Sequence, residues 1–308
     1  MKKTAVKIML RIIVITAAVI AVAVGVFCAY MSRTLSIPKG RMTLDGEREW
    51  AKSHGVWGDL EKYDVEDYTV EGKDGYLLHC AFVSDSETKA GDKYVIISHG
   101  YTSNRYGAAK YVPIYIELGY NCVIYDLRGH GENDLTVCTI GNYESQDLLK
   151  LIDDTYGRYG DDICLGLHGE SMGSSTTLSA LGEGANVRFA VADCGFTNLY
   201  ELIGTGFKAN HIAFLEPLVD LDNRLFYGWS MKDTHAIDLV GNTSVPVCFI
   251  HGADDTFITP DNSERLKDAC GGYTEIHIVD GAGHAQSREI LGRSAYKKIV
   301  SDFLANIG

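Results

Sequence analysis

The sequence has no low-complexity run and no internal repeat in its 308 residues. Its composition is ordinary for a globular protein, with 46% hydrophobic and 22% charged residues. A chain of this length and composition can bury a core, and it suits one large α/β domain with a short appendage, or two small domains.

Basic residues are scarce after position 42, where 21 Lys and Arg stand against 41 Asp and Glu, a net charge of −20. Such a domain repels phosphate backbones, so we expect no nucleic-acid partner. The sequence also lacks a His-Glu-x-x-His run, paired Cys-x-x-Cys motifs and a glycine-rich phosphate loop. We therefore expect no metal and no cofactor.

The eight cysteines do not indicate a disulfide framework, because a domain of this size does not need one. Half of them lie in apolar runs, where cysteine usually behaves as a small hydrophobic residue. These four are Cys28, Cys122, Cys164 and Cys248. The sequence leaves the state of the others open.

The N-terminus carries an uncharged, Ile-, Val- and Ala-rich run over residues 12–32, with four basic residues before it and three soon after. This length spans a bilayer as a helix, and the lack of a polar stripe argues against a buried core helix. A cleaved signal peptide is the main alternative, but it usually has a shorter apolar part, and Ala29-Tyr30-Met31 is a poor cleavage site. We predict an uncleaved, single-pass anchor.

The basic residues on the two sides of this run favour an N-terminus inside the cell, which places the rest of the chain outside the cytoplasm. We divide the chain into an anchor and linker, residues 1–42, and a catalytic domain, residues 43–308. The first segment supplies no predicted strand and no predicted catalytic residue, so we expect its removal to leave a soluble, active protein.

Short apolar runs alternate with longer amphipathic ones from residue 63 onward. The expected strands are 63–70, 76–83, 94–98, 120–125, 163–167, 189–192, 247–250 and 275–279. The expected helices are one around 47–52, then 108–118, 143–156, 171–181, 262–269 and 293–305. Strands buried on both faces that alternate with helices predict a mostly parallel eight-stranded sheet, opened by an antiparallel hairpin and covered on both faces.

Residues 197–240 interrupt this alternation with an aromatic-rich segment that suits helices but no strand. One interpretation is a small helical lid over the site, in which Phe207 and Phe214 line a substrate pocket. The other is a connecting helix pair whose apolar face lies in the core. Both interpretations can be correct at once.

The strongest functional signal is the run Gly169–Gly173 (Gly-Glu-Ser-Met-Gly), which stands directly between a predicted strand and a predicted helix. A sharp strand-to-helix turn strains the serine backbone and exposes its oxygen, and the flanking glycines remove side chains that would clash. Ser171 is therefore the candidate nucleophile.

A nucleophilic serine needs a base and an acid that orients the base. Asp254 and Asp255 follow the predicted strand 247–250, and His284 follows the last predicted strand. The order Ser, Asp, His predicts a triad of Ser171, Asp255 and His284. Asp254 stays open as the acid, and Asp193, at the end of an earlier strand, is the reserve candidate.

An oxyanion needs two N–H donors. One is expected from Met172, directly after the nucleophile, and the other from Tyr101 in the loop after the first parallel strand. Gly100 lets this backbone approach the substrate, and His99 is assigned a structural role.

These motifs together resemble the α/β-hydrolase superfamily over about residues 63–308, and most of all its serine-aminopeptidase-like and lysophospholipase-like group, which includes bacterial membrane-anchored members. The motifs on which this resemblance rests are His99-Gly100-Tyr101, the run 126–131 (Asp-Leu-Arg-Gly-His-Gly), the run 169–173, His251-Gly252-x-x-Asp255 and Gly281-x-Gly283-His284. The resemblance implies a structural role for Asp126, Arg128 and His130. The family usually has a proline four residues after the acid. Here Pro260 is five residues after Asp255, and this departure keeps Asp254 as an alternative acid.

These residues predict a serine hydrolase that cleaves carboxylic esters of a small acyl substrate through an acyl-enzyme. A peptidase, aminopeptidase or thioesterase would use the same triad with another leaving group. A membrane-bound binding protein that keeps only the fold is the alternative from a different class.

Overall fold

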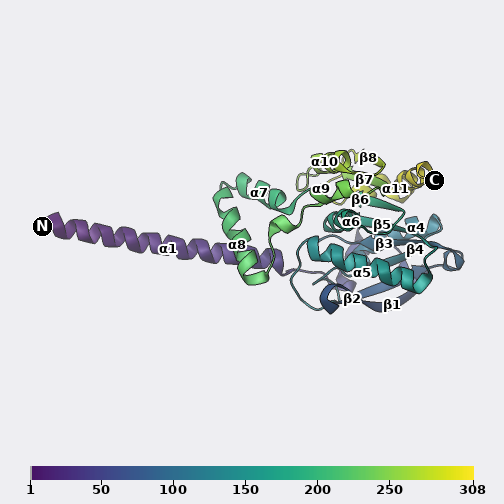
Figure 1. The fold of residues 1–308 in the computed structure, drawn as a ribbon, viewed down its shortest axis with the longest axis horizontal. Coiled ribbons are helices and arrows are strands. Elements are labelled where there is room, and N and C mark those ends of the chain that lie inside the picture. The colour runs from purple at the N-terminus through teal and green to yellow at the C-terminus, as the bar shows by residue number, and fades with distance from the viewer. Residues whose placement is uncertain (1) are drawn as a thin grey trace.

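Figure 1 shows the computed structural model, which describes residues 2–308, with side chains from Thr4 onward. A long N-terminal helix, α1 (Lys2–Ser36), projects from an α/β domain. Its most apolar window has a mean hydropathy of 2.9, so by length and composition this helix could cross a membrane or serve as a signal sequence.

The eight predicted strands are confirmed and form one sheet. They are β1 (Asp64–Glu71), β2 (Leu77–Ser84), β3 (Lys93–Ser98), β4 (Asn121–Tyr125), β5 (Cys164–Glu170), β6 (Phe189–Asp193), β7 (Val247–Gly252) and β8 (Thr274–Val279). Their spatial order is β1-β2-β4-β3-β5-β6-β7-β8. The first two strands pair antiparallel to their neighbours and all others are parallel, so the carboxyl ends of β3 to β8 meet at one edge.

The sheet is covered on both faces because its strands alternate between two apolar layers. In β3, Tyr94 and Ile96 pack into one hydrophobic cluster, and Val95 and Ile97 pack into the other. Helices α5 (Asn142–Tyr159), α6 (Met172–Gly182) and α10 (Asp261–Ala269) cover the first face. Helices α3 (Arg105–Ala108), α4 (Val112–Glu117) and α11 (Ser287–Asn306) cover the second.

Two predicted helices differ in detail from those observed. The helix predicted over 108–118 is divided into α3, a 3-10 turn (Ala109–Tyr111) and α4. The last helix begins at Ser287, before the predicted residue 293, and bends at Gly292, whose φ of 74° is one that glycine adopts without steric cost. A short helix before the sheet, α2 (Leu44–Ser53), matches the expectation near 47–52.

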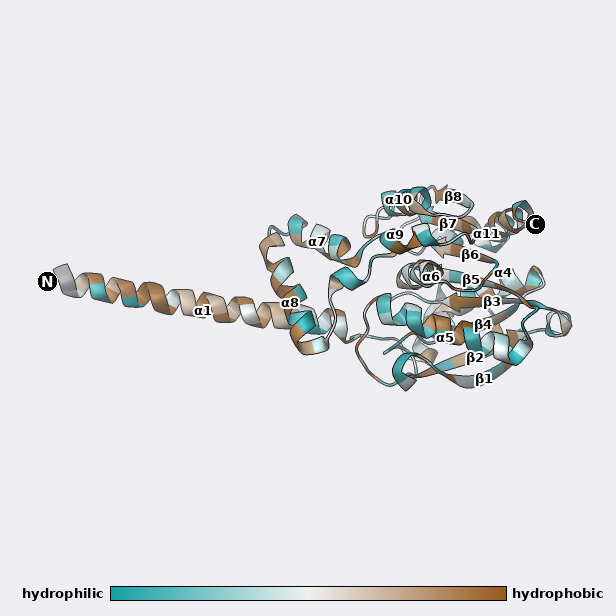
Figure 2. Ribbon diagram, in the orientation of Figure 1, coloured by the Kyte–Doolittle hydropathy of each residue, from teal (hydrophilic) through white to brown (hydrophobic). Residues whose placement is uncertain are grey.

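Residues 197–240, which we call the insert, connect β6 to β7 and contain α7 (Leu199–Ala209), α8 (Glu216–Tyr227) and α9 (Ala236–Leu239). The predicted helical character is confirmed. In Figure 1, α8 lies beside the domain end of α1 and α7 lies next to α8, on the side of the sheet edge where the parallel strands terminate. Figure 2 shows hydrophobic residues along most of α1 and also on α7 and α8.

The last turns of α1 pack against the domain, which the expected division at residue 42 did not foresee. The hydroxyl of Ser32 donates a hydrogen bond of 2.5 Å to the Asn223 side chain in α8. The indole N–H of Trp229 donates to Ser36 Oγ at 3.0 Å, and the Cys138 N–H donates to the Ser36 carbonyl at 2.8 Å. The end of α1 is therefore structurally part of the catalytic domain.

All eight cysteines are free thiols. Three of the cysteines that were expected in apolar runs lie in strands of the sheet: Cys122 in β4, Cys164 in β5 and Cys248 in β7. Cys80, Cys138 and Cys194, which the sequence left open, are also buried.

Candidate active site

Ser171 stands alone between the end of β5 and the start of α6, with φ 55° and ψ −117°. These angles are strained for a residue with a side chain. A Cβ on Gly169 would overlap the carbonyl of Gly173, and a Cβ on Gly173 would overlap that of Ser98. The turn therefore needs both glycines, and it holds the serine oxygen at the carboxyl edge of the sheet.

The structure brings the three predicted triad residues into one hydrogen-bonded chain. Ser171 Oγ lies 2.9 Å from His284 Nε2, and His284 Nδ1 lies 2.7 Å from Asp255 Oδ2. His284 comes from the loop after β8, and Asp255 comes from the loop after β7. Residues far apart in sequence thus meet because their strands end at the same sheet edge.

Asp255 is fixed by its own loop. Its Oδ1 accepts hydrogen bonds of 2.9 Å from the N–H groups of Phe257 and Ile258. Burial alone would raise the pKa of Asp255, but hydrogen bonds from His251 and His284 outweigh it and hold the pKa well below its usual range. An acid in this state stays ionised and can orient the His284 ring through Nδ1–H.

The two alternative acids lie elsewhere. Asp254 is exposed to solvent. Asp193 is buried, and its carboxylate accepts hydrogen bonds from Tyr296 at 2.9 Å and Ser287 at 3.2 Å. Burial, with the Glu170 carboxylate adding to it, raises the pKa of Asp193 to about 7. Among the described residues, the carboxylate that His284 contacts is that of Asp255.

The predicted oxyanion donors border the same cavity as the nucleophile: Tyr101 and Met172 both line it beside Ser171. Met172 is the first residue of α6, where N–H groups have no partner within the helix. His99 has a structural role, as expected. Its Nε2 accepts the Leu127 N–H at 2.9 Å, and burial lowers its pKa to about 4.

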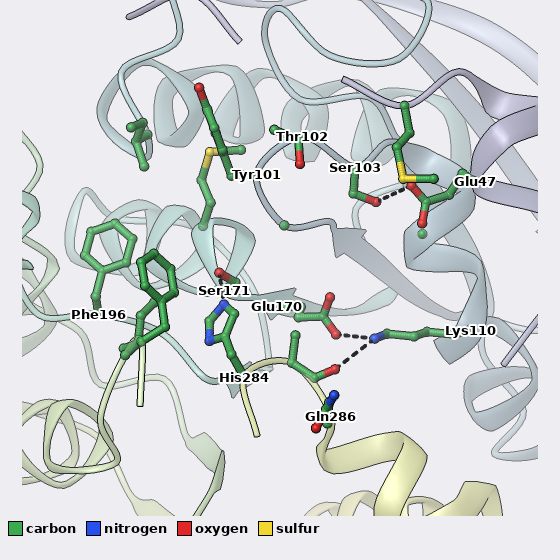
Figure 3. A pocket seen from close by; sticks show the side chains of 18 of the residues that line it. Glu47, Tyr101, Thr102, Ser103, Lys110, Glu170, Ser171, Phe196, His284 and Gln286 are labelled. Carbon is green, nitrogen blue, oxygen red and sulfur yellow. Dashed lines mark hydrogen bonds and ion pairs between the residues drawn. The ribbon is translucent and has the colours of Figure 1, made fainter. Parts of the chain in front are cut away.

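A cavity of about 730 Å³ opens at Ser171, and Figure 3 shows it from close by. Most of its wall is apolar and comes from several separate parts of the chain. The apolar lining includes Leu35, Met42, Trp50, Val56, Phe196, Leu199, Leu202, Ile203, Phe257, Ile258 and Ile290. Leu35 belongs to α1 and Met42 to the segment that follows, so the N-terminal segment supplies part of the pocket.

The two residues predicted to line this pocket do not line it. Phe207 is buried in the hydrophobic core, and Phe214 is 69% exposed on the outside of the insert. The pocket-facing side of α7 instead carries Leu199, Leu202 and Ile203. The insert does wall the pocket, but through aliphatic residues near its start, because Phe207 lies one turn beyond Ile203 on the same side of α7, where that side packs into the core.

One corner of the cavity is polar and was not identified from the sequence. Lys110 Nζ lies 2.5 Å from a Glu170 oxygen and 3.1 Å from Glu289, as Figure 3 shows for Glu170. Glu47 lines the same cavity and accepts a 3.0 Å hydrogen bond from Ser103. The position of Glu170 next to Ser171 could have signalled its place at the site, whereas nothing in the sequence marks Lys110.

The run 126–131 serves the fold. Arg128 forms a two-pronged ion pair with Asp147, with distances of 2.9 and 2.7 Å. Asp126 is fully buried and accepts hydrogen bonds from Arg105. These contacts hold the loop after β4 against neighbouring elements, and they fit the structural role that the resemblance implied.

Comparisons with known proteins agree on the fold. The model of the prolyl oligopeptidase family matches residues 108–307. The curated Bacillus subtilis (strain 168) protein described as "Uncharacterized protein YqkD" is 30% identical over 308 residues, covering 98% of each chain. The Pyrococcus furiosus esterase Pf2001 superposes with a TM-score of 0.64 at 23% identity, over 81% of this chain and 94% of that one. The Pyrococcus horikoshii acylaminoacyl peptidase gives 0.59 at 17% identity, over 79% of this chain and 41% of that one.

Proposed function

The chain belongs to the prolyl oligopeptidase family and is a serine hydrolase with the α/β-hydrolase fold, and from this premise we propose that it cleaves carboxylic esters through an acyl-enzyme on Ser171. The observation that carries the proposal is the hydrogen-bonded chain Ser171–His284–Asp255 at the edge of a largely apolar cavity. A binding protein that kept only the fold would have no need for this geometry.

In the proposed mechanism, Ser171 Oγ attacks the ester carbonyl carbon while its proton passes to His284 Nε2. The oxygen that becomes negative is bound by the N–H groups of Tyr101 and Met172. The C–O bond then breaks, and the alcohol leaves with the proton from His284. Water, deprotonated by the same imidazole, attacks the acyl-enzyme, and the carboxylic acid departs as Ser171 regains its proton.

The cavity favours uncharged esters with an apolar acyl group. Its wall contains Leu199, Leu202 and Ile203 from the insert and Ile290 from α11, which can bury a short to medium acyl chain. The net charge of −20 beyond residue 42 also disfavours polyanionic substrates at low salt.

Covalent labelling tests this proposal. A fluorophosphonate should label the full-length protein on Ser171, and methylumbelliferyl acetate should be hydrolysed. Ser171→Ala should remove both signals while the unfolding temperature stays close to that of the wild type. Hydrolysis by Ser171→Ala near the wild-type rate would contradict the mechanism.

A peptidase is the second candidate, and the polar corner of the cavity supports it. Glu47, Glu170 and Glu289 face a single cation, Lys110, so the corner carries an excess of negative charge that suits the amine of a substrate. The family match and the acylaminoacyl peptidase fold agree with this reading. Aminoacyl anilides compared with esters of equal side-chain length distinguish the two: faster turnover of the anilides would favour the peptidase.

We also propose that α1 is an uncleaved anchor that holds the domain outside the cytoplasm. Removal of α1 as a signal peptide would delete Leu35 from the pocket wall and Ser32 from its contact with α8. The mass of the chain purified from membranes should therefore correspond to all 308 residues. Protease added to spheroplasts should digest the domain, and a protected domain would reverse the proposed orientation.

A further inference from the structure

The surroundings of α1 change along its length. From Thr4 to Ala23 its side chains are exposed on all sides. From Val24 onward one face is in contact with the domain, with spacings of three and four residues. This face consists of Val24, Phe27, Cys28, Met31, Ser32, Leu35 and Ser36. The contact extends into the charge-free run 12–32 from its C-terminal side.

The uncharged part of α1 that is free of the domain is too short to span the hydrocarbon core of a bilayer. A hydrocarbon core of about 30 Å needs about 20 helical residues at 1.5 Å each. The uncharged residues before Val24 supply only about 18 Å. If α1 spans the bilayer, about 12 Å of the span lies alongside the domain, and its neighbour there is α8.

The exposed side of α8 has the character expected at that depth. Together with the turn before it, this helix exposes a stripe of large apolar side chains, spaced by three and four residues. They are Phe214, Leu218, Leu221, Leu225 and Phe226, between 42% and 70% exposed.

The side of α8 that faces the protein is mostly polar, with Val219 as its one buried apolar residue, so this helix departs from the usual pattern of a helix in water. Asp220 and Asn223 are buried there. Asp220 accepts hydrogen bonds from Ser230 and from the Met231 N–H, each 2.8 Å long, and Asn223 accepts from Ser32. Apolar side chains outside, with hydrogen bonds inside to the Asp220 carboxylate and the Asn223 carbonyl oxygen, form an arrangement that suits lipid.

We propose that α8 is immersed in the bilayer beside α1, and that the catalytic pocket receives a membrane lipid ester through the insert. The insert contributes to both sites: α8 exposes the apolar stripe on the outside, and Leu199, Leu202 and Ile203 of α7 line the pocket. Leu35 of α1 completes the wall between pocket and membrane. The lipid-ester substrate rests on the proposed esterase activity, whereas the immersion of α8 does not.

Immersion is tested by fluorescence in the full-length protein reconstituted in phosphatidylcholine vesicles. Leu225→Trp adds a fluorophore to the stripe. Val65→Trp adds one at the start of β1, level with the amino-terminal end of β4 and thus at the sheet edge opposite the site. After subtraction of the wild-type signal, lipid brominated on its acyl chains should quench most of the fluorescence from Leu225→Trp and leave that from Val65→Trp unchanged. An unquenched Leu225→Trp signal would overturn the proposal and indicate that water or a second protein covers the stripe.

Substrate delivery is tested with two esters that share a leaving group, soluble methylumbelliferyl acetate and methylumbelliferyl oleate held in the vesicles. Leu225→Glu should keep kcat/KM for the acetate and lower turnover of the oleate at least roughly tenfold, because a carboxylate resists immersion. The matched control, Val65→Glu, should change neither. Equal losses on both esters, or no loss on the oleate, would overturn the delivery route. A wild-type protein inactive on both esters would contradict the proposed function, while the quenching result would still decide immersion.

Discussion

The hydroxyl of Tyr101 donates a hydrogen bond of 3.0 Å to the carbonyl oxygen of Thr34. The first residue belongs to the loop proposed to bind the oxyanion, and the second lies in the last turn of α1. The next residue of the loop is tied down as well, because the Thr102 carbonyl accepts the Met42 N–H at 2.8 Å. The N-terminal segment therefore holds the proposed oxyanion loop at two consecutive residues.

Removal of this support should impair catalysis. Tyr101→Phe deletes the hydroxyl that bonds to Thr34 and keeps the ring and the backbone N–H. We expect kcat on a soluble ester to fall roughly three- to tenfold with little change in KM, since a hydrogen bond of this kind contributes about 1 kcal/mol. A rise in KM with kcat unchanged would show that the contact shapes the pocket and not the oxyanion loop.

Truncation gives a second test, and the structure reverses the expectation from sequence. Deletion of residues 1–23 removes the turns of α1 in which the described side chains, 4–23, are exposed, and it should leave soluble-ester activity in detergent near the wild-type value. Deletion of residues 1–42 also removes Leu35 and Met42 from the pocket and should lower activity at least roughly tenfold. Full activity after the longer deletion would restore the sequence-based expectation.

Neighbouring carboxylates allow a matched test of the acid. Asp255→Asn should lower kcat by roughly three to four orders of magnitude, because the amide no longer favours the tautomer with Nδ1–H. Asp254→Asn, at an exposed position beside it, should change kcat less than about twofold. Steady-state kinetics on one soluble ester suffices, and a reversed order would assign the acid to Asp254.

Asp193 predicts a pH dependence of stability. Its pKa is raised to about 7 by burial, compared with about 4 in an unfolded chain, so the folded state binds the proton more tightly. Its contribution to stability is present below about pH 4 and is lost as the pH rises toward 7. Urea unfolding of the detergent-solubilised protein should show this decline, and Asp193→Asn should flatten it. An identical slope in the variant would assign the decline to other groups.

Two substitutions in α7 distinguish a residue of the pocket wall from a residue of the core. Ile203→Ala should shift the preferred acyl chain toward longer esters, because Ile203 lines the cavity. Phe207→Ala should lower the free energy of unfolding by about 3–5 kcal/mol and leave the chain-length profile unchanged, because Phe207 is buried in the core. A changed profile in Phe207→Ala alone would return that residue to the pocket.

The sequence predicts well whatever depends on strands buried on both faces. All eight strands were found because such runs are continuously apolar, and Asp255 and His284 could be expected near Ser171 because parallel strands end at one edge. The elbow at Ser171 followed from its glycines, which the turn requires for steric reasons. These features are local or follow from topology.

The insert was predicted less well, for a physical reason. An apolar stripe indicates which face of a helix avoids water, but not whether that face meets the core, the substrate or lipid. In α7 one stripe supplies both core and pocket, so Phe207 was misplaced. The exposed position of Phe214 could not be inferred from a pattern that assumes water outside.

The bond between Ser32 and Asn223 also bears on the order in which the protein is made. Its partners are 191 residues apart, and Ser36 and Trp229 are 193 residues apart. At roughly 5–20 residues per second, the ribosome delivers Asn223 about 10–40 s after Ser32. The proposed anchor is therefore in place well before α8 exists, and the contact between these two helices can form only late in synthesis.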